Sequence, residues 1–95
     1  MTKYWQPDEV MGLWDNGGET LDRYSIHLFY TTEEDSYEEL ICTNWCLSIF
    51  SRAEQFDTGE HLGKEIDWKD LPEELQAYLI MEVEGTVKQL NGERV

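Results

Sequence analysis

The feature that most constrains the fold is a change in hydrophobic period along the chain, from two residues to nearly four. Residues 22–30 alternate between apolar and polar side chains, which is typical of a strand with one buried face. Residues 40–50 are rich in β-branched and aromatic side chains and predict a second, central strand. Because the two segments are close in sequence, we expect an antiparallel hairpin closed by the acidic residues 31–39. The side chains that share a face are Tyr24, Ile26, Leu28 and Tyr30 in the first strand, and Ile41, Thr43, Trp45, Leu47 and Ile49 in the second.

The last part of the chain predicts one long helix. Asp70 is a suitable N-cap, Pro72 fits the first turn, and Glu73 completes the spacing of a capping box. Asn91 and Gly92 supply a stop signal. The apolar stripe comprises Leu75, Tyr78, Leu79, Val83, Thr86, Val87 and Leu90, whereas Ile80 and Met81 lie beside it and predict a second contact, either with the N-terminal segment or with another subunit.

These elements predict one compact domain over residues 1–95, of the α+β class. We expect a small antiparallel sheet of two or three strands packed against the long C-terminal helix. Residues 64–68 are the candidate third strand, and residues 4–14 suit either a short amphipathic helix or an edge segment. A compact chain of this length is on the order of 30 Å across.

The charge balance excludes several classes of function. Seven lysines and arginines stand against 21 aspartates and glutamates, a formal net charge of −14. Direct binding to nucleic acid or to an anionic membrane depends on clustered cations and is not expected. No apolar run reaches the ~20 residues that span a bilayer, and the first residues lack the apolar stretch of a signal peptide, so we expect a cytoplasmic protein. A basic partner protein is favoured, with the chain itself a monomer or a homodimer.

Two segments resemble motifs of a known family. Residues 15–26 read D-N-G-G-E-T-L-D-R-Y-S-I, and residues 62–74 read L-G-K-E-I-D-W-K-D-L-P-E-E. They resemble the D-N-G-G-x-T-x-D-R-Y opening and the L-G-K-x-I and D-L-P-E closing segments of a family of small uncharacterised phage and plasmid proteins. Between these segments, relatives often carry a P-F-H-P-like stretch and a glycine ahead of the histidine, and residues 52–61 of this chain keep only the glycine, Gly59, and the histidine, His61. The resemblance implies a mobile genetic element in a bacterial host cell, and no reaction.

Candidate catalytic and metal-binding residues are few. Cys42, Cys46, His27 and His61 are the residue types of a zinc site. Positions four apart on a strand are separated by ~13 Å, however, so we expect two buried thiols and no metal. His61 lies in a glycine-flanked loop near two carboxylates, without a recognisable nucleophile, and His27 is expected on the exposed face of its strand. We therefore expect no enzyme and no cofactor.

The segment Asn16-Gly17-Gly18 has two interpretations. Its backbone amides could bind phosphate, but it lacks the lysine of a P-loop and precedes a strand rather than a helix. The carboxylates around it would also repel an anion, so a structural turn is expected. Arg23 is surrounded by carboxylates and is expected to form an internal salt bridge; the candidate partners are Asp22, Glu19 and Asp15.

The acidic surface is the remaining functional signal. Fourteen net charges equal those on roughly 24 Å of duplex DNA, so a rigid array of carboxylates could occupy the basic groove of a nucleic-acid-binding protein. We predict an inhibitor that mimics nucleic acid and blocks the DNA- or RNA-binding channel of a host defence protein, of the anti-CRISPR or anti-restriction type. The alternative is a structural or accessory subunit that self-associates through its sheet edge or C-terminal helix. The predicted partner-binding residues are Glu33, Glu34, Asp35, Tyr37, Glu38, Glu39, Glu54, Asp57, Glu60, Glu65, Asp67, Trp68, Asp70, Glu73 and Glu74, with Phe56 as a further aromatic anchor.

Overall fold

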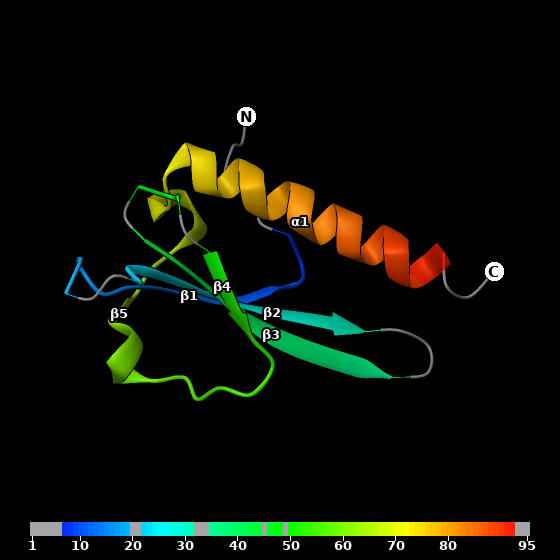
Figure 1. Ribbon diagram of the computed structural model, residues 1–95, viewed down its shortest axis with the longest axis horizontal. Coiled ribbons are helices and arrows are strands. Elements are labelled where there is room, and N and C mark those ends of the chain that lie inside the picture. The colour runs from blue at the N-terminus through cyan, green and yellow to red at the C-terminus, as the bar shows by residue number, and fades with distance from the viewer. Residues whose placement is uncertain (1–6, 20–21, 32–34, 45, 49, 93–95) are drawn as a thin grey trace.

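The computed structural model describes residues 7–19, 22–31, 35–44, 46–48 and 50–92. In this part of the chain, one antiparallel sheet with the strand order β4-β3-β2-β1-β5 accompanies one long helix (Figure 1). The α+β class is therefore confirmed, but the predicted two or three strands are too few, because five strands pair within the described residues. The strands are β1 (Val10–Asp15), β2 (Tyr24–Thr31), β3 (Ser36–Thr43), β4 (Phe50–Ala53) and β5 (Lys64–Glu65), the helix is α1 (Glu73–Gly92), and two short 3-10 helices are η1 (Glu60–Leu62) and η2 (Trp68–Asp70).

β2 and β3 form the predicted hairpin at the centre of the sheet. Ile26 pairs with Ile41 across it, in antiparallel register. The alternation predicted for β2 is confirmed, because the four side chains assigned to its apolar face are all buried. The acidic loop is shorter than predicted, since β2 extends to Thr31 and β3 begins at Ser36.

The second predicted strand, residues 40–50, ends early. β3 stops at Thr43, the chain turns, and β4 returns alongside β3 from Phe50. The turn is stabilised by Asn44, whose side-chain oxygen accepts a hydrogen bond from the Ser48 amide at 2.9 Å and whose backbone oxygen accepts one from the Leu47 amide at 3.1 Å. Leu47 adopts a φ of 59°. Local hydrogen bonding by an asparagine therefore outweighs the β-propensity of this segment. Trp45 and Ile49, which the prediction assigned to the buried face, lie outside the described residues.

β1 and β5 complete the other half of the sheet. β1 pairs with both β2 and β5, which settles residues 10–15 as a strand rather than a helix. The candidate strand at residues 64–68 is only two residues long, because the chain enters η2 at Trp68. Gly63, immediately before β5, has a φ of 106°, and a Cβ built on it would lie 2.4 Å from the Asn16 Cα. Only glycine allows the chain to approach the end of β1 this closely.

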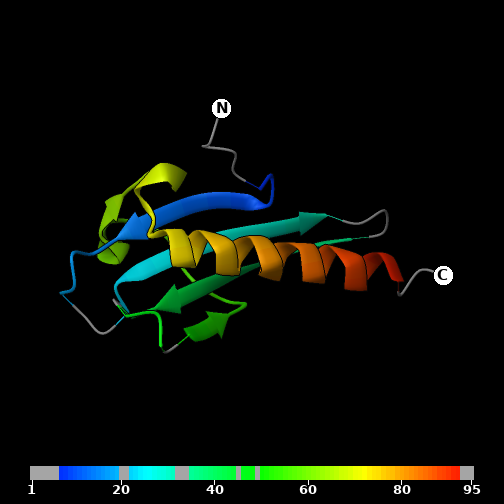
Figure 2. The same ribbon diagram turned by 90° about the horizontal axis from the view of Figure 1, so that it is seen from above.

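α1 covers one face of the sheet and lies lengthwise over its middle, with β1 on one side and β4 on the other (Figure 2). The core between the two layers contains Leu75, Leu79 and Val83 of the predicted helical stripe, packed against the apolar side chains of β1, β2 and β3. Burial of this stripe is the main force that holds α1 on the sheet.

α1 begins at Glu73, two residues later than an N-cap at Asp70 predicts. Asp70 is instead the last residue of η2, and its carboxylate accepts a hydrogen bond from the amide of Asp67, the N-cap of η2, at 3.0 Å. Beside the helical stripe, Ile80 faces residues 7–9 across a pocket of about 440 Å³, while Met81 is 70% exposed. Ile80 packs against the core and shares this pocket with residues 7–9, so its side of the helix faces the N-terminal segment.

The opposite face of the sheet is crossed by the connection between β4 and β5. These strands form opposite edges of the sheet, so residues 54–63 must span four strand spacings, roughly 19 Å. Figure 1 shows this segment on the side of the sheet opposite to α1. Phe56 packs against His27 of β2, with the ring centroids 5.1 Å apart and the ring planes at 73°. His27 is consequently half-buried rather than exposed.

Candidate partner-binding surface

Six predicted partner-binding carboxylates lie at one end of the molecule, distributed from the face that the β4–β5 connection crosses to the face that α1 covers. They lie on η1, β5, η2 and the first turn of α1, at the end of the sheet opposite to the β2–β3 hairpin (Figures 1 and 2). All six residues are exposed, and Lys64 and Lys69 are the cations among them, so the segment 60–74 carries a formal net charge of −4. We call this surface the acidic end; its carboxylates are Glu60, Glu65, Asp67, Asp70, Glu73 and Glu74.

The acidic end is held by buried residues and backbone hydrogen bonds. The Ile66 amide donates to the Leu13 oxygen at 2.9 Å, which extends the pairing beyond β5. The Gln76 side chain of α1 donates to the backbone oxygens of Trp68 at 2.9 Å and Leu71 at 3.2 Å. These contacts fix the carboxylates relative to the sheet and the helix.

Trp68 was predicted to be an exposed aromatic anchor for the partner, and the predicted exposure is wrong. Its side chain is only 4% exposed and belongs to the hydrophobic core, together with Leu71. A tryptophan in this short connection buries more apolar area than its neighbours, so it docks η2 against the fold. Trp68 therefore positions the acidic end and cannot touch a partner.

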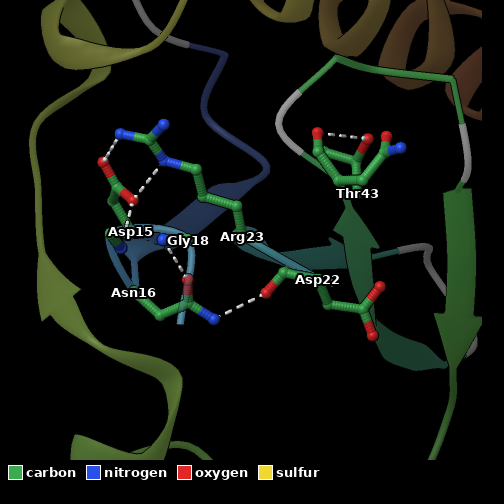
Figure 3. A network of polar contacts seen from close by, with 8 residues as sticks. Asp15, Asn16, Gly18, Asp22, Arg23 and Thr43 are labelled. Atoms are coloured by element: carbon green, nitrogen blue, oxygen red, sulfur yellow. Dashed lines mark hydrogen bonds and ion pairs between the residues drawn. The ribbon is translucent and has the colours of Figure 1, made fainter. Parts of the chain in front are cut away.

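The β1–β2 turn adjoins the acidic end, and both of its glycine amides already have acceptors within the turn. The Gly17 amide donates to Asp15 Oδ1 and the Gly18 amide to Asn16 Oδ1, both at 2.8 Å (Figure 3). The Asn16 side-chain nitrogen donates to the Asp22 backbone oxygen at 2.8 Å, which closes the turn. The structural interpretation of this segment is thus confirmed, since its own side chains satisfy both glycine amides.

The salt bridge predicted for Arg23 is also present, with Asp15 as the partner. Arg23 Nε lies 2.9 Å from Asp15 Oδ1, across the base of the turn (Figure 3). The Arg23 guanidinium holds the pKa of the Asp15 carboxyl below its ordinary value of 3.8. This cation is therefore occupied within the fold.

The other predicted carboxylates do not join the acidic end. Asp35 and Glu38 lie at the β2–β3 hairpin, at the far end of the molecule, and Glu38 Oε2 is 2.6 Å from His27 Nε2. Glu54 and Asp57 are exposed on the connection that crosses the sheet. Glu33 and Glu34 lie outside the described residues. The predicted site is therefore not one continuous surface.

Glu39 and Phe56 are less accessible than predicted. The Glu39 residue is only 8% exposed, and its carboxylate pairs with Arg52 at 3.2 Å. Phe56 is half-buried against His27, as described above. Tyr37 remains 40% exposed and stacks on Tyr30, with centroids 5.1 Å apart, so it is the predicted aromatic anchor that a partner can reach.

Sequence reasoning missed a second cluster, around Arg52 on β4. Arg52 forms ion pairs with Glu39 of β3 and with Glu82 of α1, and its guanidinium lies 3.4 Å from the Tyr78 hydroxyl. Burial alone would lower the Arg52 pKa, but the hydrogen bonds to Glu82 and Tyr78 and the negative charge of Glu39 hold it above its ordinary range. The alternation of side chains along a strand could have shown that Glu39 is buried, because Glu39 lies two residues before Ile41 and therefore points to the same face of the sheet. The position of Glu82 against β4 could not be read from local pattern.

The cysteines and histidines do not form a metal site in the described part of the chain. Among those residues, no three histidine, cysteine or carboxylate side chains lie close enough to hold an ion. Cys42 is half-buried beside Ser25, and burial raises its pKa. Cys46 is exposed, so the prediction of two buried thiols is wrong for this residue; the turn after β3 carries it out of the sheet. A hydrogen bond with Ser48 lowers the pKa of the Cys46 thiol. His61 is exposed in η1.

Comparisons with known proteins give no relative. No family model, no curated protein and no solved structure matches the chain. Within residues 7–19, 22–31, 35–44, 46–48 and 50–92, no helix has both the length and the hydrophobicity needed to cross a lipid bilayer.

The overall charge density is lower than that of duplex DNA. The longest dimension of the molecule is 44 Å, rather than the roughly 30 Å expected from the chain length. A net charge of −14 along that axis corresponds to one charge per about 3 Å. This spacing is close to the 3.4 Å of a single nucleic-acid strand and about twice the 1.7 Å of a duplex.

Proposed function

We propose that this chain is a non-enzymatic interaction protein that binds the basic nucleic-acid channel of a host defence protein and competes there with DNA or RNA. The acidic end is the binding surface, and the observation that carries the proposal is the presentation of its six carboxylates on short, hydrogen-bonded elements. The resemblance to phage and plasmid proteins supplies the setting, a bacterial cytoplasm in which anti-CRISPR and anti-restriction proteins act. The charge density favours imitation of a single strand over imitation of a duplex.

Rigid presentation is what distinguishes such a protein from a merely acidic one. A disordered acidic tail loses conformational freedom when it docks, whereas carboxylates on a folded frame lose only side-chain freedom. Trp68 and Gln76 fix the backbone of the acidic end, so its charges are already spaced before binding. A negative surface also accelerates the encounter with a basic channel and makes the association sensitive to salt.

A second candidate function is self-association through the sheet. β4 pairs with β3 along one side only, which leaves its other edge available to another strand. This edge is four residues long, and two copies that each carry a net charge of −14 repel one another at low salt. The mass of the protein in solution tests this alternative, which requires a stable oligomer that persists in high salt.

Affinity capture from a bacterial lysate tests the main proposal. The bait is compared with an acidic-end variant (Glu65→Gln, Glu73→Gln and Glu74→Gln) and with a control variant that loses three exposed carboxylates elsewhere (Asp8→Asn, Asp57→Asn and Glu84→Gln). We expect the wild-type and control baits to retain a basic nucleic-acid-binding protein at low salt and to release it at high salt. Equal retention by the acidic-end variant, or binding that is insensitive to salt, would contradict the proposal.

A further inference from the structure

The β1–β2 turn contains an asparagine followed by glycine, the dipeptide most prone to spontaneous deamidation. The pair is Asn16-Gly17, and a second pair, Asn91-Gly92, ends α1. In this reaction the nitrogen of the glycine bonds to the asparagine Cγ, the bond from Cγ to Nδ2 breaks, and ammonia leaves with the proton that the glycine nitrogen gives up through water. A water molecule then opens the succinimide ring to aspartate or isoaspartate. Glycine favours the attack because it has no Cβ to hinder the approach of its nitrogen.

The turn engages every polar group that the reaction at Asn16 uses. The Gly17 amide donates to Asp15 Oδ1 at 2.8 Å, so loss of its proton breaks a hydrogen bond. Asn16 Oδ1 accepts from the Gly18 amide and Asn16 Nδ2 donates to the Asp22 backbone oxygen, both at 2.8 Å (Figure 3). Attack on Cγ makes that carbon tetrahedral and moves both Oδ1 and Nδ2 away from these partners. The closed turn therefore opposes each step of the reaction.

The carboxylate that accepts the Gly17 amide is a weak base. Arg23 Nε lies 2.9 Å from Asp15 Oδ1, and Arg23 Nη2 lies 3.2 Å from Oδ2. The hydrogen bond with Arg23 lowers the Asp15 pKa, and a carboxylate with a lowered pKa removes a proton less readily. Asp15 therefore holds the Gly17 amide in place without activating its nitrogen.

We propose that Asn16 is a deamidation site that the β1–β2 turn keeps closed, and that modification requires local opening of this turn rather than unfolding of the domain. The hydrogen bonds that close the turn join residues 15–18 to one another and to Asp22 and Arg23. They can break while the sheet and α1 stay packed, as local openings of surface turns do. The reaction then proceeds at a rate proportional to the fraction of molecules in which the turn is open.

Neither product fits the closed turn. Aspartate at position 16 replaces the Nδ2 donor with an oxygen, so two acceptors face each other at the Asp22 backbone oxygen. Isoaspartate adds a methylene carbon to the backbone where Gly63 passes Asn16 too closely for even a Cβ. Modification is therefore expected to open the turn permanently and to weaken the pairing of β5, which follows Gly63, with β1.

Peptide mapping by mass spectrometry tests the inference after incubation in mildly alkaline buffer with and without urea. In urea, where the fold is lost, Asn16 and Asn91 are expected to react at similar rates, so Asn91 is the internal standard. In native buffer the rate at Asn16 is expected to fall at least about tenfold below its rate in urea, because two or more hydrogen bonds must break before it reacts.

Two variants distinguish local from global opening, each measured as the ratio of its native rate to its own rate in urea. Asp15→Ala removes the acceptor of the Gly17 amide and is expected to raise this ratio at Asn16 about fivefold. Val83→Ala destabilises the core beneath α1 without touching the turn and is expected to leave the ratio unchanged. The urea midpoint of each variant establishes that it is folded in native buffer.

Equal rates at Asn16 in native buffer and in urea would overturn the inference, because the turn would then give no protection. A larger increase in Val83→Ala than in Asp15→Ala would also overturn it, because the reaction would then require unfolding of the domain. Asn16→Asp reproduces one product and is expected to lower the urea midpoint more than Gln55→Glu, which adds the same charge at an exposed position. Equal midpoints in these two variants would contradict the misfit of the product.

Discussion

Gly63 is the residue on which the position of the acidic end depends most directly, and Gly63→Ala tests this dependence. A Cβ at this position would lie 2.4 Å from Asn16 Cα and 2.6 Å from the Asp15 oxygen, whereas ordinary contacts begin at 3.4 Å. The backbone must therefore move by about 1 Å, and the φ of 106° is itself unfavourable for alanine. The strained conformation costs about 1–3 kcal/mol, and loss of one or two backbone hydrogen bonds between β1 and β5 adds about 1 kcal/mol.

We therefore expect Gly63→Ala to lower the free energy of unfolding by about 2–4 kcal/mol, a large part of the stability of a small domain. Urea denaturation followed by tryptophan fluorescence measures this change, since Trp68 is buried and becomes exposed on unfolding. Gly85→Ala is the matched control, because a Cβ at this helical position meets nothing within 4 Å. It is expected to raise the free energy of unfolding by about 0.5–1 kcal/mol. A Gly63→Ala protein that unfolds at the wild-type urea concentration would refute the reasoning.

Three further predictions concern the core, the turn and the thiols. Leu79→Ala removes a fully buried side chain from the face of α1 that packs on the sheet, and in the same urea experiment it is expected to lower the free energy of unfolding by about 2–5 kcal/mol. A loss below about 1 kcal/mol would show that α1 does not pack on the sheet in this way. The pKa of Asp15 is lower in the folded state than its ordinary 3.8, so its pairing with Arg23 stabilises the fold above that pH, and this contribution is lost as the pH falls through the folded-state pKa. Asp15→Asn should therefore lower the free energy of unfolding by up to about 1 kcal/mol at pH 7 and by progressively less as the pH falls below 3.8; a loss that does not change with pH would contradict the assignment. Iodoacetamide should modify Cys46 well before Cys42, because Cys46 is exposed and has a lowered pKa, whereas Cys42 is half-buried and has a raised pKa. Peptide mass spectrometry measures the order of modification, and the reverse order would be inconsistent with the turn after β3.

Local patterns predicted the parts of the fold that local physics determines. The alternation in β2, the helical stripe around Leu79 and the Asp15–Arg23 pair all follow from residues that are near one another in sequence. The break after Thr43 was not predicted, because the β-branched composition of residues 40–50 hid the hydrogen bonds that Asn44 makes within its own turn.

The composition of the site was harder to predict than the fold. Trp68 was placed on the surface because the docking of η2 cannot be read from neighbouring residues. Glu39 was also placed on the surface, although the alternation of side chains along β3 puts it on the same buried face as Ile41. The acidic end was predicted as a run of sequence, whereas its shape depends on the pairing of β5 with β1, which joins segments about 50 residues apart. The separation of the hairpin carboxylates from the acidic end depends on the same topology.

Competition for a nucleic-acid channel is the most direct measurement of what the acidic end does. The partner recovered by affinity capture is loaded with labelled single-stranded nucleic acid, and displacement of the label is followed as wild-type or acidic-end variant is added. We expect the wild-type protein to displace the label in a salt-dependent manner, the control variant to match it, and the acidic-end variant to need at least tenfold more protein. Simultaneous binding of nucleic acid and the wild-type protein, with no displacement at any concentration, would contradict the account.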